Sequence, residues 1–178
     1  MAREYPESPA GSFKGPPRRF QDAEGRKITV DEFGAYHGHD DEYEKLVTMY
    51  VAFNPEDRAQ GLPPKGEERV RSWLDILLRD DCLNVVAWHE ESAVGHATLV
   101  PDEDDYELAI FVLRKYQNSG IGTNLLETLL GLAQERGVER VYLTVERWNT
   151  PARKLYRKMG FEQTSRESFE IEMTLRLV

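Results

Sequence analysis

The chain has 178 residues and a formal net charge of −9, and 40% of its residues are hydrophobic. This composition is typical of one soluble globular domain with a sizeable core. It argues against nucleic acid or an anionic membrane as the main partner, because both require a basic face. Cys82 is the only cysteine, which excludes an internal disulfide and favours a reducing, cytoplasmic compartment. The apolar runs are far shorter than a membrane span, and the first residues lack the apolar stretch of a secretory signal, so we expect neither feature.

The first part of the chain divides into an arm and the start of a mixed α/β pattern. Residues 1–27 are rich in Pro and Gly, so we expect an extended, mobile arm ahead of a domain over 28–178. The arm carries the basic side chains Lys14, Arg18, Arg19, Arg26 and Lys27. Residues 28–33 alternate as a strand, and apolar stripes predict helices over 40–53 and 67–79.

The second part of the chain continues this mixture. Further elements are expected as strands over 84–91, 92–100 and 106–113, a helix that ends at Gly137, a strand over 138–146, a helix over 150–160 and a strand over 168–177. The strand over 106–113 is almost continuously apolar, which predicts burial on both faces. The resulting order, βααβββαβαβ, indicates an α/β fold.

A glycine-containing turn, Gln-Asn-Ser-Gly-Ile-Gly-Thr over 117–123, joins the apolar strand to the next helix. The first amides of a helix lack backbone partners and carry the positive end of the helix dipole. Gly120 and Gly122 remove the Cβ atoms that would keep a phosphate away from these amides. The spacing matches neither a dinucleotide-binding fingerprint nor a P-loop. Alone, the pattern fits an anion site or a tight turn without a ligand.

A second motif, Glu-Arg-Trp-Asn-Thr-Pro-Ala-Arg-Lys-Leu-Tyr-Arg-Lys-Met-Gly-Phe, follows the next strand. We expect Thr150 to cap its helix and Pro151 to occupy the first position, which leaves Asn149 free just outside. The helix has one apolar stripe, so Tyr156 is expected to point inward or along the wall of a cleft. The stripe consists of Ala152, Leu155, Tyr156 and Met159.

Together these two stretches resemble the GNAT superfamily of N-acetyltransferases. The acetyl-CoA motif of that family, Gln/Arg-x-x-Gly-x-Gly/Ala, is matched by Gln117, Gly120 and Gly122. Its second motif is matched by Asn149, Ala152, Leu155, Tyr156, Gly160 and Phe161. The resemblance is close over 106–161 and loose over the rest of the domain. It implies the GNAT fold, an α/β (α+β) domain with a central mixed, mainly antiparallel sheet of six to seven strands flanked by about four helices.

The resemblance also implies a cofactor site. Acetyl-CoA would place its pyrophosphate on the amides of 118–123, and its pantetheine arm would pair like an extra strand between two central strands that splay apart. Asn149 would bond the cofactor near the pantetheine. The expected cofactor-binding residues are Ile110, Phe111, Val112, Gln117, Asn118, Ser119, Gly120, Ile121, Gly122, Thr123 and Asn149.

No metal site is expected. The loop residues His37, His39, Asp40 and Asp41 are close in sequence, but such residues rarely converge on a metal without a distant third ligand. His96 falls on a strand, where a structural role is preferred.

Aminolysis of a thioester requires two proton transfers. An alkyl ammonium must lose a proton, which costs about 4–5 kcal/mol at neutral pH, and the thiolate must gain one. In the family the tyrosine of the second motif serves as the acid, which assigns that role to Tyr156; a core tyrosine with a satisfied hydroxyl is the alternative. The base is open. Glu107 is the first candidate, Glu146 the second, and ordered water the third, because Thr144 occupies the place of a glutamate that one branch of the family uses.

The expected function is transfer of acetyl from acetyl-CoA to a primary amine in a direct ternary complex. The acceptor would be a protein lysine or a small cationic amine, attracted by the acidic residues at 102–105, Glu107 and Glu146. A non-catalytic acyl-CoA-binding module and an interaction protein that uses its basic arm are the alternatives. A homodimer is also considered.

Overall fold

A single mixed sheet forms the centre of the computed structural model, which describes residues 3–59, 61–166 and 169–178. The strands are β1 (Arg18–Gln21), β2 (Lys27–Glu32), β3 (Leu83–His89), β4 (Ser92–Asp102), β5 (Asp105–Val112), β6 (Arg140–Glu146), β7 (Glu162–Arg166) and β8 (Glu170–Arg176). The helices are α1 (His39–Val51), α2 (Glu67–Leu77), α3 (Ile121–Glu135) and α4 (Thr150–Met159), with short 3₁₀ turns η1 (Pro55–Asp57) and η2 (Arg114–Tyr116).

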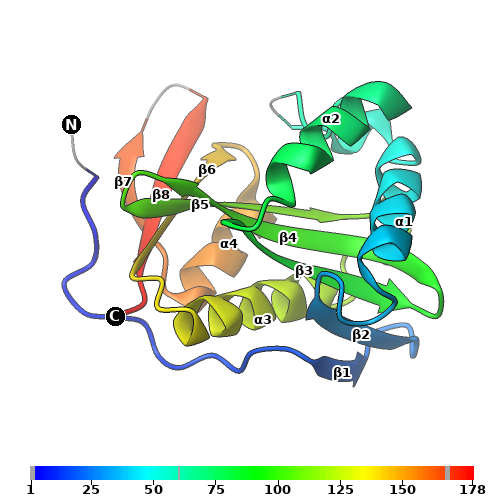
Figure 1. The fold of residues 1–178 in the computed structure, drawn as a ribbon. Coiled ribbons are helices and arrows are strands. Elements are labelled where there is room, and N and C mark those ends of the chain that lie inside the picture. Colours follow the sequence, from blue (N-terminus) through cyan, green and yellow to red (C-terminus); the bar gives the residue numbers. More distant parts are fainter. Residues whose placement is uncertain (1–2, 60, 167–168) are drawn as a thin grey trace.

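The order of strands across the sheet is β1-β2-β3-β4-β5-β6-β8-β7. All neighbouring strands are antiparallel except β5 and β6, which are parallel. Helices α1 and α2 cover one face of the sheet, and α3 and α4 cover the other (Figure 1). The predicted mixed, mainly antiparallel sheet with about four helices is confirmed, although the described residues form eight strands rather than six or seven.

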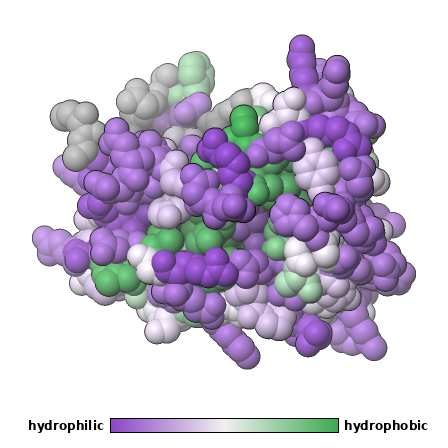
Figure 2. All heavy atoms as spheres, viewed as in Figure 1, coloured by the Kyte–Doolittle hydropathy of each residue, from purple (hydrophilic) through white to green (hydrophobic). Residues whose placement is uncertain are grey.

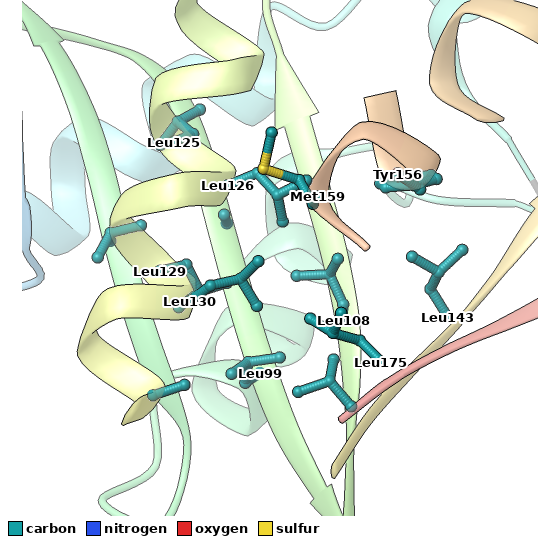
Figure 3. Packing of buried hydrophobic residues seen from close by; sticks show 14 of the residues in the cluster. Leu99, Leu108, Leu125, Leu126, Leu129, Leu130, Leu143, Tyr156, Met159 and Leu175 are labelled. Atoms are coloured by element: carbon teal, nitrogen blue, oxygen red, sulfur yellow. The ribbon is translucent and has the colours of Figure 1, made fainter. Parts of the chain in front are cut away.

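Each face of the sheet has its own apolar core. On the α3 side, the leucines of the helix point onto β4 and β5, and α4 adds further apolar side chains (Figure 3). This cluster includes Leu99, Leu108, Leu125, Leu126, Leu129, Leu130, Tyr156 and Met159. On the other side, α1 and α2 pack on β3 through Leu46, Tyr50, Val70, Leu74, Val86 and Trp88. Helices on both faces explain why the central strands are apolar at nearly every position.

A buried polar chain joins four elements beneath the α1–α2 layer. The Tyr50 hydroxyl lies 2.6 Å from Nδ1 of His96, and Nε2 of His96 lies 2.7 Å from Oδ1 of Asn84. The Asn84 side-chain amide donates to the Leu77 carbonyl at 2.8 Å. Burial lowers the pKa of His96 to about 3, so the ring is neutral, and the chain is consistent if Tyr50 donates to Nδ1. The structural role expected for His96 is confirmed.

Two strands were missed by the sequence analysis. β1 pairs with β2, with Arg18 opposite Val30, and lies in the stretch expected as an arm. β7 pairs with β8 at the other edge of the sheet. Both are short, polar edge strands, and such sequences carry little of the alternation that identifies a half-buried strand.

The rest of the arm is fixed to the domain by backbone and side-chain contacts. The Ala10 amide donates to the Arg176 carbonyl at 2.7 Å. The Gln134 side chain accepts from the Phe13 amide at 2.8 Å and donates to the Gly11 carbonyl at 3.0 Å. The arm therefore runs along α3 before it enters β1 (Figure 1).

The arm crosses α3 most closely at Gly131. A Cβ atom there would overlap the backbone of Lys14 and Gly15, which has no flexible end that could move aside. Gly131→Ala should therefore lower the free energy of unfolding by about 1–3 kcal/mol, although alanine favours an isolated helix by about 1 kcal/mol. Chemical denaturation measures the change. Gly122→Ala in the same helix, where a Cβ has room, is the control, and equal stability of the two variants would contradict the close crossing.

Candidate active site

The central strands β5 and β6 pair over only a short distance and then diverge. Their parallel pairing is limited to Tyr106 opposite Val141 and Glu107 opposite Tyr142. β5 stays paired with β4 as far as Val112. Beyond residue 107, the edge of β5 that faces β6 therefore carries backbone groups that pair with no strand among the described residues. The splay expected of the two central strands is confirmed.

A cavity of about 330 Å³ opens into this gap. Its walls come from 107–111 of β5, 144–146 of β6, α4, and the α2 side chains Trp73, Ile76 and Leu77. Figure 2 shows hydrophobic side chains gathered at the end of α2 on an otherwise largely hydrophilic face. A mostly apolar wall with a few polar groups is typical of a small-molecule site.

Tyr156 reaches the cavity from α4. Its ring packs against Phe161 with 5.8 Å between the ring centres, which fixes the direction of the side chain. Among the described residues none is hydrogen-bonded to the Tyr156 hydroxyl, and burial alone accounts for the shift of its pKa. Burial raises the pKa of Tyr156 to about 12, so the hydroxyl keeps its proton at neutral pH. The group is therefore a protonated donor on a residue that lines the cavity.

Glu107 reaches the same cavity from the opposite face of the sheet. Alternate residues of a strand point to opposite faces, so Glu107 shares a side with Phe111, which packs with the α1–α2 core, whereas Leu108 joins the α3–α4 core. Partial burial raises the pKa of the Glu107 carboxyl, the charge of Asp102 adds to the rise, and Arg3 opposes it. Glu146, at the end of β6, also lines the cavity.

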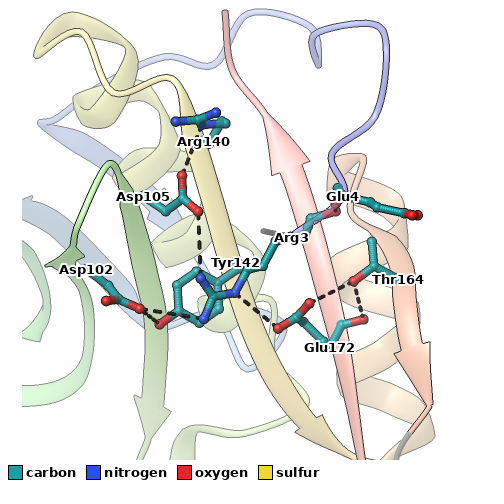
Figure 4. A network of polar contacts seen from close by, with 9 residues as sticks. Arg3, Glu4, Asp102, Asp105, Arg140, Tyr142, Thr164 and Glu172 are labelled. Carbon is teal, nitrogen blue, oxygen red and sulfur yellow. Dashed lines mark hydrogen bonds and ion pairs between the residues drawn. The ribbon is translucent and has the colours of Figure 1, made fainter. Parts of the chain in front are cut away.

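Two acidic residues where β4 turns into β5, Asp102 and Asp105, already have cationic partners. Arg3 lies 3.6 Å from Asp102 and 3.7 Å from Asp105, and Arg140 lies 3.0 Å from Asp105 (Figure 4). The guanidinium carbon of Arg3 stands 3.4 Å from the centre of the Tyr142 ring, and the Tyr142 hydroxyl donates to Asp102 at 2.5 Å. These contacts reduce the contribution of Asp102 and Asp105 to the attraction of a cationic acceptor.

The glycine turn before α3 presents free amides. Asn118 and Gly120 adopt left-handed conformations, with φ of 57° and 92°, and Gly120 is the N-cap without a side-chain cap. Among described residues, none accepts a hydrogen bond from the amides of 120–123. The Gln117 side chain donates to the Val112 carbonyl at 3.0 Å and ties the turn to the end of β5.

The expected cofactor residues fall into two groups. The first group lines the cavity and consists of Ile110, Phe111 and Asn149. The second group forms the turn and consists of Gln117, Asn118, Ser119, Gly120, Ile121, Gly122 and Thr123. Val112 lies between the groups, through the carbonyl that Gln117 binds. The side chains of Ser119 and Ile121 are buried, so a ligand would meet their backbone only. Their contact with a cofactor remains a prediction.

The cap of α4 differs from the expectation. Asn149, and not Thr150, is the N-cap, and its Oδ1 accepts from the Ala152 amide at 3.3 Å. The prediction that Asn149 is free was therefore wrong. The physical reason is that asparagine caps helices at least as well as threonine. Its side-chain nitrogen has no partner in the described part of the chain and remains a donor for a ligand.

Several residues of the cavity wall, among them Thr98 and Val100 of β4, were not predicted from the sequence. Thr98 of β4 lines the cavity, and its buried hydroxyl has no partner among the residues that the structure describes. Trp73 of α2 also belongs to the wall, where its ring meets Phe111 edge-on at 5.3 Å. A single threonine in a strand and a tryptophan in a helix stripe carry no signal that separates wall from core.

The described ranges contain neither a cluster of metal ligands nor a membrane-spanning helix. No group of three or more His, Cys, Asp and Glu residues there is arranged to hold a metal ion. No helix within those ranges has the length and apolar character needed to cross a bilayer.

Comparison with known sequences connects this site to a family. The acetyltransferase (GNAT) family model matches residues 43–161. An uncharacterised N-acetyltransferase of Mycobacterium tuberculosis is 32% identical over 89 residues, which cover 49% of this chain and 57% of that protein. An N-alpha-acetyltransferase of Sulfurisphaera tokodaii is 42% identical over 57 residues, 32% of this chain and 34% of that protein. The match thus spans about half the length of the Mycobacterium protein and about a third of the length of the Sulfurisphaera protein.

Solved structures show the same fold. The GNAT domain of S. lividans PAT has a TM-score of 0.73 at 20% identity and covers 90% of this chain and 97% of its own. The PaiA N-acetyltransferase from Thermoplasma acidophilum, solved in complex with coenzyme A, has a TM-score of 0.63 at 19% identity and covers 84% and 98%. At these identities the likeness concerns the fold alone. The family model, however, matches more than half of the sequence, including both motifs, and the chain therefore belongs to the GNAT family of acetyltransferases.

Proposed function

We propose that the protein is an acetyl-CoA-dependent N-acetyltransferase that moves the acetyl group to a primary amine. The observation that carries this proposal is the shared cavity. A protonated tyrosine hydroxyl without a partner among the described residues and a carboxylate reach it from opposite faces of the sheet. Membership of the family and the coenzyme A complex of PaiA support the choice of donor.

The chain offers groups that suit each part of the donor. The amides of 120–123 have no acceptor among described residues, and a Cβ built at Gly120 meets nothing within 4 Å, so a pyrophosphate has both donors and room. The unpaired edge of β5 suits the two amides of a pantetheine arm. The Asn149 side-chain nitrogen adds a donor within the cavity.

The reaction requires one bond to form and one to break. The neutral amine attacks the thioester carbonyl carbon, the C–N bond forms, and the C–S bond breaks. Glu107, directly or through water, takes the proton that the amine loses, and Tyr156 gives a proton to the departing sulfur. A carboxyl with a raised pKa is a stronger base once ionised, so activity should rise with pH as Glu107 and then the amine lose their protons.

The acceptor is a cationic amine on an apolar chain, such as a lysine side chain or a polyamine. Glu107 and Glu146 provide negative charge within the cavity, and Trp73, Ile76 and Leu77 provide an apolar wall for a methylene chain. The name of the Sulfurisphaera relative adds peptide α-amines as a class to compare.

A screen of amines tests the proposal against a non-catalytic acyl-CoA-binding module. Polyamines, lysine peptides and peptide α-amines are incubated with acetyl-CoA, and thiol release is recorded with and without protein. We expect release that depends on both the protein and one class of amine. Coenzyme A binding without amine-dependent thiol release for any class would favour the binding module.

A further inference from the structure

The turn between β1 and β2 lies directly against the glycine turn. The Ala23 amide donates to the Ser119 carbonyl at 2.9 Å. Arg26 donates from Nη1 to the Lys115 carbonyl at 3.3 Å, and its guanidinium carbon lies 4.1 Å from the centre of the Tyr116 ring. These three contacts join the β1–β2 turn to η2 and to the residue just before Gly120.

Asp22 fixes Arg26 in this position. The Asp22 side chain is fully buried, and its Oδ2 accepts from Nε of Arg26 at 2.7 Å. Its Oδ1 accepts from the amides of Glu24 at 3.0 Å and Arg26 at 2.9 Å. Burial opposes ionisation of the Asp22 carboxyl, but the hydrogen bonds from Arg26 and Glu24 outweigh it and lower the pKa. Nη2 of Arg26 is buried and has no hydrogen-bond partner among the described residues, while the side chain as a whole is 17% exposed.

The contacts continue from Arg26 to the free amides. Tyr116, beneath the guanidinium, is held by a 2.6 Å contact between its hydroxyl and Nδ1 of His89. The Ser119 hydroxyl donates to the Tyr116 carbonyl at 2.5 Å. Ser119 lies between the two left-handed residues of the turn, Asn118 and Gly120. A turn with two left-handed residues readily changes conformation when nothing supports it. These contacts restrict the turn before a ligand binds, so less conformational entropy is lost on binding.

We propose that Asp22 and Arg26 are positioning residues that hold the glycine turn in the conformation that binds the pyrophosphate of coenzyme A. The inference rests on the proposed function, because it assumes that this turn binds coenzyme A. It assigns part of the cofactor site to the N-terminal segment, although neither side chain contacts the ligand. Asp22 and Arg26 should therefore affect the affinity only of ligands that carry a pyrophosphate.

Arg26→Gln is the first test, and Arg19→Gln is its control. Arg19 is an exposed residue of β1 without an ion pair in the described structure, and the two variants lose the same charge. We expect Arg26→Gln to raise the Kd of coenzyme A about tenfold, as for loss of a charge-assisted contact, and to raise KM for acetyl-CoA with little change in kcat. Kinetics with acetyl-pantetheine, which lacks the pyrophosphate, should match the wild type. If Arg26 only stabilised the fold, Arg26→Gln would impair the kinetics with acetyl-CoA and with acetyl-pantetheine alike.

Asp22→Asn separates positioning from direct attraction by the sign of the change. If Arg26 attracted the phosphates directly, neutralising Asp22 would free its charge and tighten coenzyme A binding. Positioning predicts weaker binding instead. Tighter binding, equal Kd values for the Arg26 and Arg19 variants, or equal losses with both donors would overturn the inference. Wild-type protein that does not bind coenzyme A would overturn the proposed function itself, which a calorimetric titration of the wild type shows first.

Discussion

Gly122→Asp should weaken the binding of coenzyme A by about a hundredfold or more while the domain stays folded. Gly122 is the second residue of α3, and a Cβ there would come no closer than 3.9 Å to Leu155, so a side chain has room in the free protein. A carboxylate in the first turn of a helix stabilises the helix. The same carboxylate would stand where the pyrophosphate is expected, and repulsion between desolvated like charges of several kcal/mol gives a loss of about a hundredfold or more.

Two other variants sharpen this test. Gly122→Ala adds a Cβ without charge, and a much smaller loss is expected. Gly120→Asp is less informative, because Gly120 has a φ of 92° and any side chain there strains the backbone. Calorimetry gives the affinity and thermal unfolding gives the stability. A folded Gly122→Asp protein with wild-type affinity would show that the pyrophosphate binds elsewhere.

Tyr156→Phe should lower kcat about ten- to a thousandfold, the range for loss of a general acid that solvent partly replaces. The ring and its packing on Phe161 are kept, so the affinity for acetyl-CoA should change little. Because burial raises the pKa of Tyr156 to about 12, the hydroxyl does not titrate in an ordinary assay. The variant should therefore keep the shape of the pH profile while its height falls.

Tyr36→Phe is the matched control, because Tyr36 is exposed and stacks on Trp88 away from the cavity wall. It should leave kcat unchanged. The amine screen supplies a confirmed acceptor for this comparison. If the Tyr156 variant then turned over as fast as the wild type, Tyr156 would have only a structural role in the core.

The local parts of the fold and the site were predictable from the sequence. The glycine turn, the stripe of α4 and the continuous apolar run of β5 are read within a few neighbouring residues, and the structure places them as strand, turn and helix. The splay of β5 from β6 followed only from the family resemblance, because strand pairing depends on distant residues.

Most of the parts that failed depend on contacts between distant segments, and the cap of α4 is the local exception. β1 is a strand because its backbone pairs with the edge of β2. The arm lies along α3 because Gly131 has no side chain that would collide with the backbone of the arm. The contacts of Arg26 with η2 join segments that are separated by about ninety residues of sequence, as the bond from Arg26 to the Lys115 carbonyl shows. The cap of α4 was a choice between two adjacent good capping residues, which local preference does not decide.

A crystal structure with coenzyme A bound tests the central claim most directly. The proposal predicts the pyrophosphate on the amides of 120–123, the pantetheine between β5 and β6, and the sulfur within hydrogen-bond reach of the Tyr156 hydroxyl. A coenzyme A molecule outside the gap between these strands, or a sulfur turned away from Tyr156, would contradict it.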